Sequence, residues 1–485
     1  MSLDGDVYLT DTIVHNIQIW SPYGDGIGSW LPEGTPTTDI DVSEDGLFFT
    51  TTGTGGGVTE SAVLYDEDPA TDPVVWGGHG TEAGSFLEPA GIAVDPVGRS
   101  FVVETGGQRV QVFGAEEQQL LQVFGSAGSG NEQFSQPRGI ALGPDRTVYV
   151  ADTGNHRISK WNVAVATQEA AVAGSTRIST AIEASRKAYP VDGSVDIVIL
   201  ATAYNWPDAL GGTALAGAVH GPLLLTAKDA LPTEVAAEIT RLAPKRVYVL
   251  GGTGVVSDAV LNDARALTSE NIATRLYGAD RYGTAIAIAD EVKAMRGAEY
   301  DGTAFVCTGL NFPDALSAAP IAAANGWPIY LTHTDSVLPE VVDSMMRTYG
   351  GNPSNHGYII GGTGALSEGV AYQLDELPFM GFMRISGADR YATSAEVARI
   401  GFDGLGMLMS RPALATGEDF PDALAGGVLQ GSDACPVLLT RGSVLSPHAA
   451  DVLTDYKDMI YEVRYLGGTG VISPSVRTAA RGLLW

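Results

Sequence analysis

The sequence predicts a multidomain chain in which an all-β propeller segment precedes three α/β modules with parallel sheets. Two different internal repeats support this prediction. Strand-like runs recur 40 to 53 residues apart between residues 7 and 161, and a longer order of motifs is written three times after residue 173. The chain of 485 residues is too long for one ordinary core, and its 45% apolar and 18% charged residues are typical of globular domains.

The first half alternates apolar residues with tight turns, as the four-stranded blades of a propeller require. Its runs are "VYLTDTIVHNIQIW", "LFFTTTG", "SFVVETGGQRVQVF" and "VYVADTGNHRISKW", and a Pro-x-Gly-Ile-Ala lead-in precedes the last two. A β-sandwich would not explain the repeated lead-in. We therefore predict about four blades in residues 1–165, the first beginning inside a blade. His15 and His156 hold matching places in two blades, which predicts that they pack between blades.

The small-residue stretch "NVAVATQEAAVAG" is interpreted as a linker to the second half. Beyond it, Pro-Asp-Ala-Leu motifs place Asp208, Asp314 and Asp422 at intervals of 106 and 108 residues (314−208 and 422−314). In each copy, near-continuous apolar runs alternate with helix-period segments, which is typical of a parallel sheet covered by helices on both faces. The register predicts modules at 166–275, 276–383 and 384–485.

Each copy closes with a strand and a glycine-rich turn, written "RVYVLGGTGVVS" in the first copy. The turn lacks the lysine and the spacing of a P-loop, and it lacks the third glycine of a dinucleotide fingerprint. We therefore interpret it as a turn followed by a helix cap at Ser257, Ser367 and Ser473. An anion at the helix N-terminus stays open, because the amides exposed there attract negative charge.

The start of the Pro-Asp-Ala-Leu helix offers two interpretations. Asn205, Asn311 and Asp419 precede the motif and are expected to cap this helix. The aspartate inside the motif suits the positive end of the helix dipole, but it also stands at the carboxyl edge of the sheet, where α/β units bind ligands.

Arginines and threonines recur in every copy. The arginine either holds a loop together with the aspartate of "GADRY" or presents a planar donor fork to a carboxylate or phosphate. The threonine that ends the "PLLLT"-type strand either terminates the strand or donates a hydroxyl to a sugar. The binding candidates are Arg177, Arg281, Arg390, Asp208, Asp314, Asp422, Thr226, Thr332 and Thr440.

Charge and motif content exclude several functions. Acidic residues number 57 against 28 basic ones, and a net charge of −29 repels nucleic acid. No apolar run reaches the roughly 18 residues that span a bilayer. Cys307 and Cys435 are expected to be buried small residues, and they do not have the spacing of a zinc site. Without a nucleophile elbow or an H-E-x-x-H helix, no catalytic or metal-binding residue is predicted.

Two family resemblances extend these interpretations. The run "VYVADTGNHRI" and its lead-in resemble the NHL repeat family, whose propellers commonly hold more blades than the four counted here. The start "MSLDGDVYLTDT" lacks the features of a signal peptide, so we expect upstream blades and a secretion signal to be missing from this chain. The motifs "GADRY", "PDAL", "PLLLT" and "LGGTG", in this order, resemble the cell wall binding repeat family, type 2, found in tandem threes on bacterial surface proteins.

The second resemblance implies modules packed around a pseudo-threefold axis that anchor the protein non-covalently to an anionic cell wall polymer. It implies a cell-wall location, with the recurring arginines and strand-end residues lining polymer grooves. The propeller is then expected to bind a protein or glycan. One alternative is a surface-anchored enzyme with a catalytic propeller, a lyase or hydrolase; another, a nucleotide-binding enzyme, requires the phosphate motifs that are absent.

The charge of the second half limits how it binds an anion. Residues 166–485 carry 34 acidic and 22 basic side chains, a net −12 (22−34). An anionic polymer therefore requires local arginines, helix N-termini, neutral hydrogen bonds or bridging divalent cations. No other cofactor is predicted.

Overall fold

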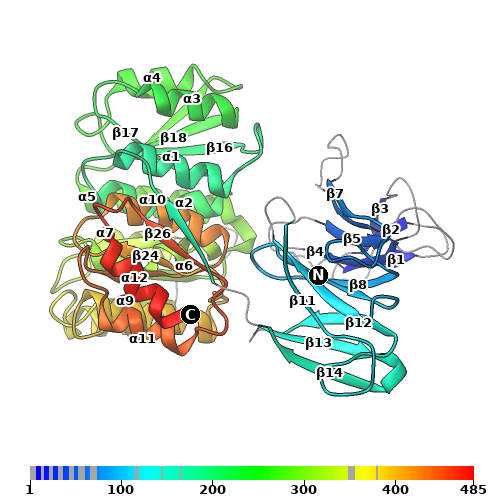
Figure 1. Ribbon diagram of the computed structural model, residues 1–485. Helices are drawn as coiled ribbons and strands as arrows, with labels where there is room; N and C mark the ends of the chain where they lie inside the picture. Colours follow the sequence, from blue (N-terminus) through cyan, green and yellow to red (C-terminus); the bar gives the residue numbers. More distant parts are fainter. Residues whose placement is uncertain are drawn as a thin grey trace. The chain divides into compact units, whose positions relative to one another are not determined.

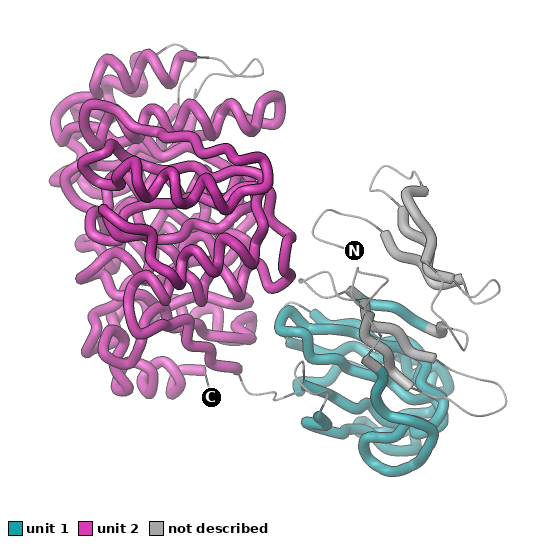
Figure 2. The backbone as a smooth tube through the Cα atoms, turned by 90° about the horizontal axis from the view of Figure 1, so that it is seen from above, with its two compact units in different colours: residues 1–166 teal, residues 167–485 magenta. Residues whose placement is uncertain are grey.

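The computed structural model divides the chain into two compact units, residues 1–166 and 167–485 (Figure 2). It describes the following residues: 7–11, 16–20, 26–30, 37–42, 48–52, 61–65, 74–114, 119–143, 146–163, 167–347, 356–377 and 381–484. The two units have different architectures, so each is described by itself.

Unit 1 is built from consecutive antiparallel sheets, in which strands that are neighbours in sequence pair with one another. This is the arrangement of propeller blades, and it confirms the predicted all-β region. The strands are β1 (Val7–Asp11), β2 (Asn16–Trp20) and β3 (Gly26–Trp30); β4 (Thr37–Val42), β5 (Phe48–Thr52), β6 (Ser61–Tyr65) and β7 (Val74–Gly77); β8 (Pro89–Val94), β9 (Ser100–Glu104), β10 (Arg109–Phe113) and β11 (Leu120–Phe124); and β12 (Pro137–Leu142), β13 (Thr147–Asp152) and β14 (Arg157–Asn162).

The first strands of neighbouring blades contact each other. The backbone N–H groups of Ile92 and Val94 on β8 donate to the carboxylates of Asp39 (3.0 Å) and Asp41 (2.7 Å) on β4. On the other side of β8, a side chain at Gly91 would collide with the carbonyl oxygen of Arg138 on β12. The glycine of the Pro-x-Gly-Ile-Ala lead-in therefore allows two blades to approach closely.

Arginines hold the later blades to the loops before them. Arg157 pairs with the fully buried Asp152 (Nε–Oδ2 2.7 Å) and donates to the carbonyl oxygens of Ser129 (3.1 Å) and Gln133 (2.7 Å). Arg109 forms the same kind of pair with Glu104 (2.6 Å) one blade earlier.

The prediction that His156 packs between blades is wrong. His156 is exposed and adopts a left-handed conformation, with φ of 54°. Its neighbours make the contacts instead, since the Asn155 amide donates to Gly128 O (2.9 Å) and to Asp152 (2.8 Å). His15, the matching residue in the first blade, lies outside the described residues.

Unit 2 contains three parallel sheets, each of four strands, which confirms the predicted α/β modules (Figure 1). The first sheet has the order β17 (Leu223–Thr226), β16 (Ile197–Thr202), β18 (Arg246–Leu250), β19 (Ile272–Leu276). The second has the order β21 (Ile329–Thr332), β20 (Thr303–Thr308), β22 (His356–Ile360), β23 (Gly381–Ile385). The third has the order β25 (Val437–Thr440), β24 (Ala413–Thr416), β26 (Glu462–Leu466), β15 (Gln168–Val172).

Strand β15 closes the ring of modules. It lies before the first module in sequence but pairs in parallel with β26 of the last, with Gln168 opposite Glu462 and Val172 opposite Leu466. Its Glu169 accepts hydrogen bonds from Tyr465 Oη (2.7 Å) and Arg481 Nε (3.1 Å). The prediction of a linker here is wrong, because residues 168–172 form the edge strand of the third sheet.

The helices of unit 2 cover the sheets, and one helix from each copy packs at the centre. They are α1 (Arg177–Ala188), α2 (Pro207–Ala218), α3 (Thr233–Leu242), α4 (Asp258–Arg265), α5 (Arg281–Arg296), α6 (Pro313–Asn325), α7 (Pro339–Met346), α8 (Glu368–Asp375), α9 (Arg390–Gly404), α10 (Pro421–Ser432), α11 (Pro447–Asp455) and α12 (Pro474–Leu484). The central helices α2, α6 and α10 contact one another and are buried over most of their length.

Small residues allow this central packing. An added Cβ at Gly217 would collide with the carbonyl of Ala323, and one at Gly431 would collide with the Ala323 side chain. One hydrophobic core consequently runs through all three modules. Cys307 and Cys435 are free and buried in it or beside it, as predicted.

Candidate functional site

The aspartates of the three Pro-Asp-Ala-Leu motifs lie where one module meets the next. Asp208, in the first turn of α2, is only 7% exposed, and it interacts with Thr284 and Arg281 at the start of α5, which belongs to the following copy. Asp314 meets Arg390 and Thr393 in the same way. Asp422 of the last copy meets Thr180 and Arg177 of the first. The structure thus brings each predicted aspartate near the predicted arginine of the next copy, and the last copy meets the first in the same way.

Burial raises the pKa of all three carboxyl groups above the usual aspartate range. The threonine hydroxyl and the arginine of the next copy act in the opposite direction but do not outweigh burial. Each junction therefore holds a buried aspartate near a guanidinium of the following copy, and burial disfavours the charged form of the aspartate.

The arginines of these pairs are half-buried and reach the end of a strand in their own copy. Arg281 donates from Nη1 to Gly309 O (2.6 Å), and Arg390 donates to Gly417 O (2.6 Å). Arg177 donates to Ala203 O (3.0 Å). Each acceptor lies one residue after the central strand of its sheet, so the arginine links that strand end to the carboxylate of the preceding module.

The glycine-rich turns complete the junctions. Their first glycines, Gly251, Gly361 and Gly467, have φ of 93°, 111° and 101°. A Cβ added at these positions would lie 2.6 to 2.7 Å from the Oδ2 atom of Asp208, Asp314 or Asp422. Glycine is therefore required both by the backbone conformation and by the carboxylate next to it. Ser257 accepts from Val260 N (3.4 Å) as a helix cap, whereas the Ser367 side chain makes no such bond.

A second set of arginines, which the sequence analysis did not identify, fixes these turns. Arg275 on β19 and Arg384 on β23 donate to Gly251 O (2.8 Å) and Gly361 O (2.9 Å). In the third copy, Arg477 of α12 donates to Gly467 O (3.0 Å). Comparing the copies would find the first two arginines, but not the third, since it comes from a different element.

Two predicted capping arrangements require correction. Asn311 and Asp419 do not cap the central helices, because their Oδ1 atoms accept from the adjacent residues Phe312 (3.0 Å) and Phe420 (2.9 Å), which are themselves the N-cap residues. The N-cap of α2 is likewise Trp206 rather than Asn205.

The aspartate of "GADRY" is itself a helix cap rather than the partner of the arginine beside it. Asp280 accepts from the backbone of Tyr282 (3.0 Å) and Gly283 (2.9 Å), and Asp389 caps α9 in the same way. In the first copy, Thr176 forms a capping box with Ser179. A threonine can replace the aspartate there because both side chains accept backbone N–H groups.

The strand-end threonines are buried and bonded within their own loops. Thr332 donates to Ser336 O (2.9 Å), Thr440 donates to Val444 O (3.1 Å), and Thr226 donates to Ala227 O (3.2 Å). All three have no exposed surface. This geometry favours the strand-terminating interpretation over contact with a sugar.

An aromatic cluster occupies the centre of the same end of unit 2. Trp206, Phe312 and Phe420 immediately precede the three motifs, and their rings are 6.2 Å (Trp206–Phe312) and 6.0 Å (Phe312–Phe420) apart. The Arg281 guanidinium lies 5.5 Å from the Trp206 ring centre, and that of Arg177 lies 5.9 Å from Phe420. This cluster, not singled out from the sequence, connects the three junctions.

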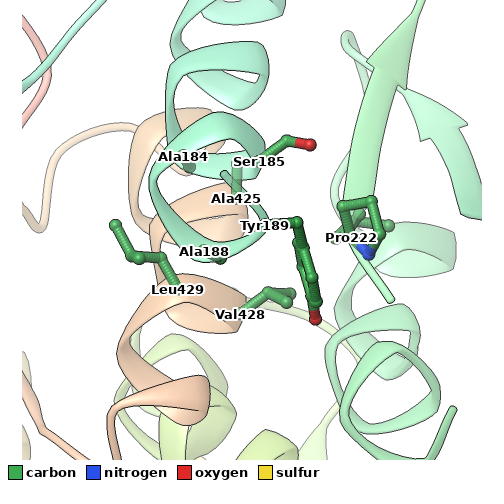
Figure 3. A pocket seen from close by; sticks show the side chains of 9 residues that line it. Ala184, Ser185, Ala188, Tyr189, Pro222, Ala425, Val428 and Leu429 are labelled. Atoms are coloured by element: carbon green, nitrogen blue, oxygen red, sulfur yellow. The ribbon is translucent and has the colours of Figure 1, made fainter. Parts of the chain in front are cut away.

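A narrow crevice lies farther along α1 and α10 (Figure 3). Its walls come from the C-terminal half of α1, from Pro222 and Leu223, and from the middle of α10. Tyr189 projects into it, and burial raises the pKa of this phenol. The lining is mostly apolar and carries no charged group, so the crevice is separate in character from the arginine junctions.

The described part of the chain holds no group of three or more histidine, cysteine or acidic side chains arranged to bind a metal ion. Among its helices, none combines the length and the apolar character of a membrane span.

Three α/β modules joined by polar junctions of the same plan define a tandem-repeat protein. The chain belongs to the cell wall binding domain 2 (CWB2) family, which it matches at residues 171–261, 275–371 and 384–477, more than half of its length. Residues 134–161 match the NHL repeat, as the sequence predicted for this segment.

Known proteins similar to this chain agree with the family. It is 28% identical to the N-acetylmuramoyl-L-alanine amidase LytC of Bacillus subtilis (strain 168) over 305 residues. This match covers 63% of this chain and 56% of LytC. The chain therefore spans little more than half the length of that relative. The fold is similar to those of Cwp6 and Cwp8 from Clostridium difficile.

For Cwp6 the TM-score is 0.60 at 20% identity, covering 92% of this chain and 67% of Cwp6. For Cwp8 it is 0.57 at 17% identity, covering 97% of this chain and 88% of Cwp8. These two structures show the shared fold, and the family match supports a cell-wall-binding protein.

Proposed function

We propose that unit 2 anchors the protein non-covalently to an anionic polymer of the bacterial cell wall, and that the contacts are made at the three junctions. One observation carries this proposal: among the described residues, the half-buried arginine of each junction donates one hydrogen bond to a backbone carbonyl, and only Arg177 donates a further one, to Asp419. A guanidinium has five N–H donors, so donors remain for a carboxylate or phosphate.

The positions of these arginines support binding of an anion although unit 2 carries a net negative charge. A net −12 over residues 166–485 disfavours an anionic ligand at long range. At a junction, however, the N–H groups of the guanidinium that make no bond within the protein act on a ligand at short range, where a charge-assisted hydrogen bond outweighs the distant surface charge. Anion binding is thereby restricted to a few sites, and bridging divalent cations would add to it over the acidic surface.

For unit 1 we propose a role in binding a protein or glycan partner, with no catalysis. Its conspicuous charged side chains, Arg109 with Glu104 and Arg157 with Asp152, are committed to each other and to backbone carbonyls. A surface-anchored enzyme with a catalytic propeller is the alternative, and it would require converging acid, base or nucleophile side chains.

The direct test is equilibrium binding of the full chain to purified Gram-positive cell walls, measured by co-sedimentation before and after acid extraction of the anionic polymers. We expect binding that extraction abolishes. Equal binding to extracted walls would contradict a polymer ligand, and no binding to either would contradict the anchor. A parallel series with a chelator is expected to show weaker binding where cations bridge; unchanged binding would exclude bridging.

A further inference from the structure

The three junctions have the same plan but differ in the charges around the arginine. At the junction of the third copy with the first, Arg177 is neutralised by Asp419 (Nη2–Oδ2 3.3 Å). Its guanidinium also lies 5.9 Å from the ring centres of both Tyr204 and Phe420. This arginine is therefore already supplied with an anion and with two aromatic faces.

The junction between the second and third copies also carries a carboxylate. Glu418 follows Gly417, the residue whose carbonyl accepts from Arg390 (2.6 Å), and the Glu418 side chain accepts from Gly442 N (3.2 Å). Glu418 is exposed and directly follows the residue whose carbonyl accepts from Arg390, so it adds a negative charge to the surface of this junction. An incoming anion meets repulsion at this junction.

The junction between the first and second copies differs from both. The residue equivalent to Asp419 is the neutral Asn205, and the residue equivalent to Glu418 is Leu310, which is 67% exposed. Arg281 has one carbonyl bond and lies 5.5 Å from the Trp206 ring centre. Among the described residues, no carboxylate lies within ion-pair distance of Arg281, although Asp208 and the helix-capping Asp280 are near it.

Trp206 adds a second feature to this junction. The residue is only partly buried, and its indole N–H has no hydrogen-bond partner among the described residues. An aromatic face with a free N–H donor at its rim suits a ring that has one apolar face and polar edges. A sugar bearing a negative group fits this combination: the ring packs beside Trp206 and Leu310, while Arg281 takes the charge.

We propose that the three junctions are not equivalent, and that the Arg281–Trp206–Leu310 junction is the principal binding site for an acidic sugar unit of the wall polymer. This inference rests on the proposed anchoring function and names the part of the ring that performs it. The Arg177 junction is closed by its own Asp419, and the Arg390 junction is weakened by Glu418.

The test compares Arg281→Ala with the matched variant Arg177→Ala in the full chain, binding to purified Gram-positive walls by co-sedimentation. Both changes remove one arginine–carbonyl bond and a cation–aromatic contact, and Arg177→Ala also removes the ion pair with Asp419 and the contact with Tyr204, so a larger structural cost is expected for Arg177→Ala and a larger binding cost for Arg281→Ala. We expect Arg281→Ala to raise the Kd about tenfold, as for loss of one charge-assisted hydrogen bond, and Arg177→Ala to raise it by a clearly smaller factor, about threefold, because its junction already holds a carboxylate. Equal effects of the two variants would overturn the inference while leaving the anchor proposal intact, provided that the wild-type chain binds.

Two surface changes keep the test valid if Arg281→Ala does not fold. Leu310→Glu copies the Glu418 charge into the proposed site at an exposed position and should weaken binding. Asp419→Asn removes the partner of Arg177 and should strengthen binding by opening a second junction. Unchanged affinity in both variants would overturn the inference. A wild-type chain that does not bind walls at all would overturn the anchor proposal and this inference together.

Discussion

Both units use an arginine in successive repeats to hold one repeat against another, but they use it to different extents. In unit 1, Arg157 pairs with the buried Asp152 and donates to the carbonyl oxygens of the preceding loop. In unit 2, Arg281 makes a single carbonyl bond and shares a junction with an aspartate whose pKa burial raises.

The difference separates a structural arginine from one that is available for binding. A guanidinium whose donors are all directed at protein acceptors has nothing to offer a ligand, and its removal leaves a buried charge unpaired. A guanidinium with spare donors at a partly open junction contributes less to stability and more to recognition. Exposure alone does not distinguish them, since Arg157 and Arg281 are both half-buried.

The largest expected effect is on the stability of unit 1. Arg157→Ala leaves the fully buried Asp152 carboxylate without its cation and should lower the free energy of unfolding by about 3 kcal/mol. Arg281→Ala in unit 2 removes one carbonyl bond and should cost about 1 kcal/mol. Urea unfolding of the full chain, followed by far-UV circular dichroism, measures both. Similar losses in the two variants would contradict the distinction drawn between the arginines.

The second effect concerns the closure of the ring in unit 2. The N–H group of Gln168 on β15 donates to Tyr461 O, just before β26 (2.8 Å). Backbone N–H groups of alternate residues in a strand point to the same side. The N–H of Ala170 therefore points to β26, and the N–H of Ala171 points away from it. Ala170→Pro removes a ladder bond and should destabilise unit 2 by about 3 kcal/mol. Ala171→Pro, the control, should cost much less. Thermal unfolding of both variants measures the two losses of stability. Equal losses would show that β15 does not close the ring through these bonds.

The sequence predicted the repeats, the parallel sheets and the residues of the junctions, but not how the copies connect. Strand β15 reads "QEAAV", which lacks the apolar character of the other strands, and its partner β26 lies almost 300 positions later. Asp208 and Arg281 are 73 positions apart (281−208), and each copy contains both residue types. Nothing local indicates that an aspartate meets the arginine of the next copy rather than its own.

The motifs themselves were easier to interpret, because their chemistry is local. The sequence predicts that the first glycine of the turn serves an unusual backbone conformation, and the positive φ of Gly251 agrees with that interpretation. The sequence does not predict the carboxylate beside this glycine, since close packing between distant segments leaves no pattern in the chain.

The smallest effect depends on pH. Burial raises the folded-state pKa of Asp208 above the ordinary aspartate value of 3.8, so the folded state holds this proton more tightly than the unfolded state. The stability that the protonated group contributes is fully present below pH 3.8 and is lost as pH rises through the raised pKa. Asp208→Asn stays neutral at every pH, so it should be more stable than the wild type near pH 7, by roughly 0.5–1 kcal/mol, with the difference vanishing towards acid pH.

Urea unfolding from pH 4 to pH 7 measures this difference, with Asp263→Asn on the exposed face of α4 as the control for loss of one negative charge. A control that shows the same pH profile would assign the effect to net charge. A less stable Asp208→Asn at neutral pH would mean that the pairing with Arg281 outweighs burial. In that case the junctions of unit 2 would be saturated like those of unit 1, and the arginines there would be structural rather than available to a polymer.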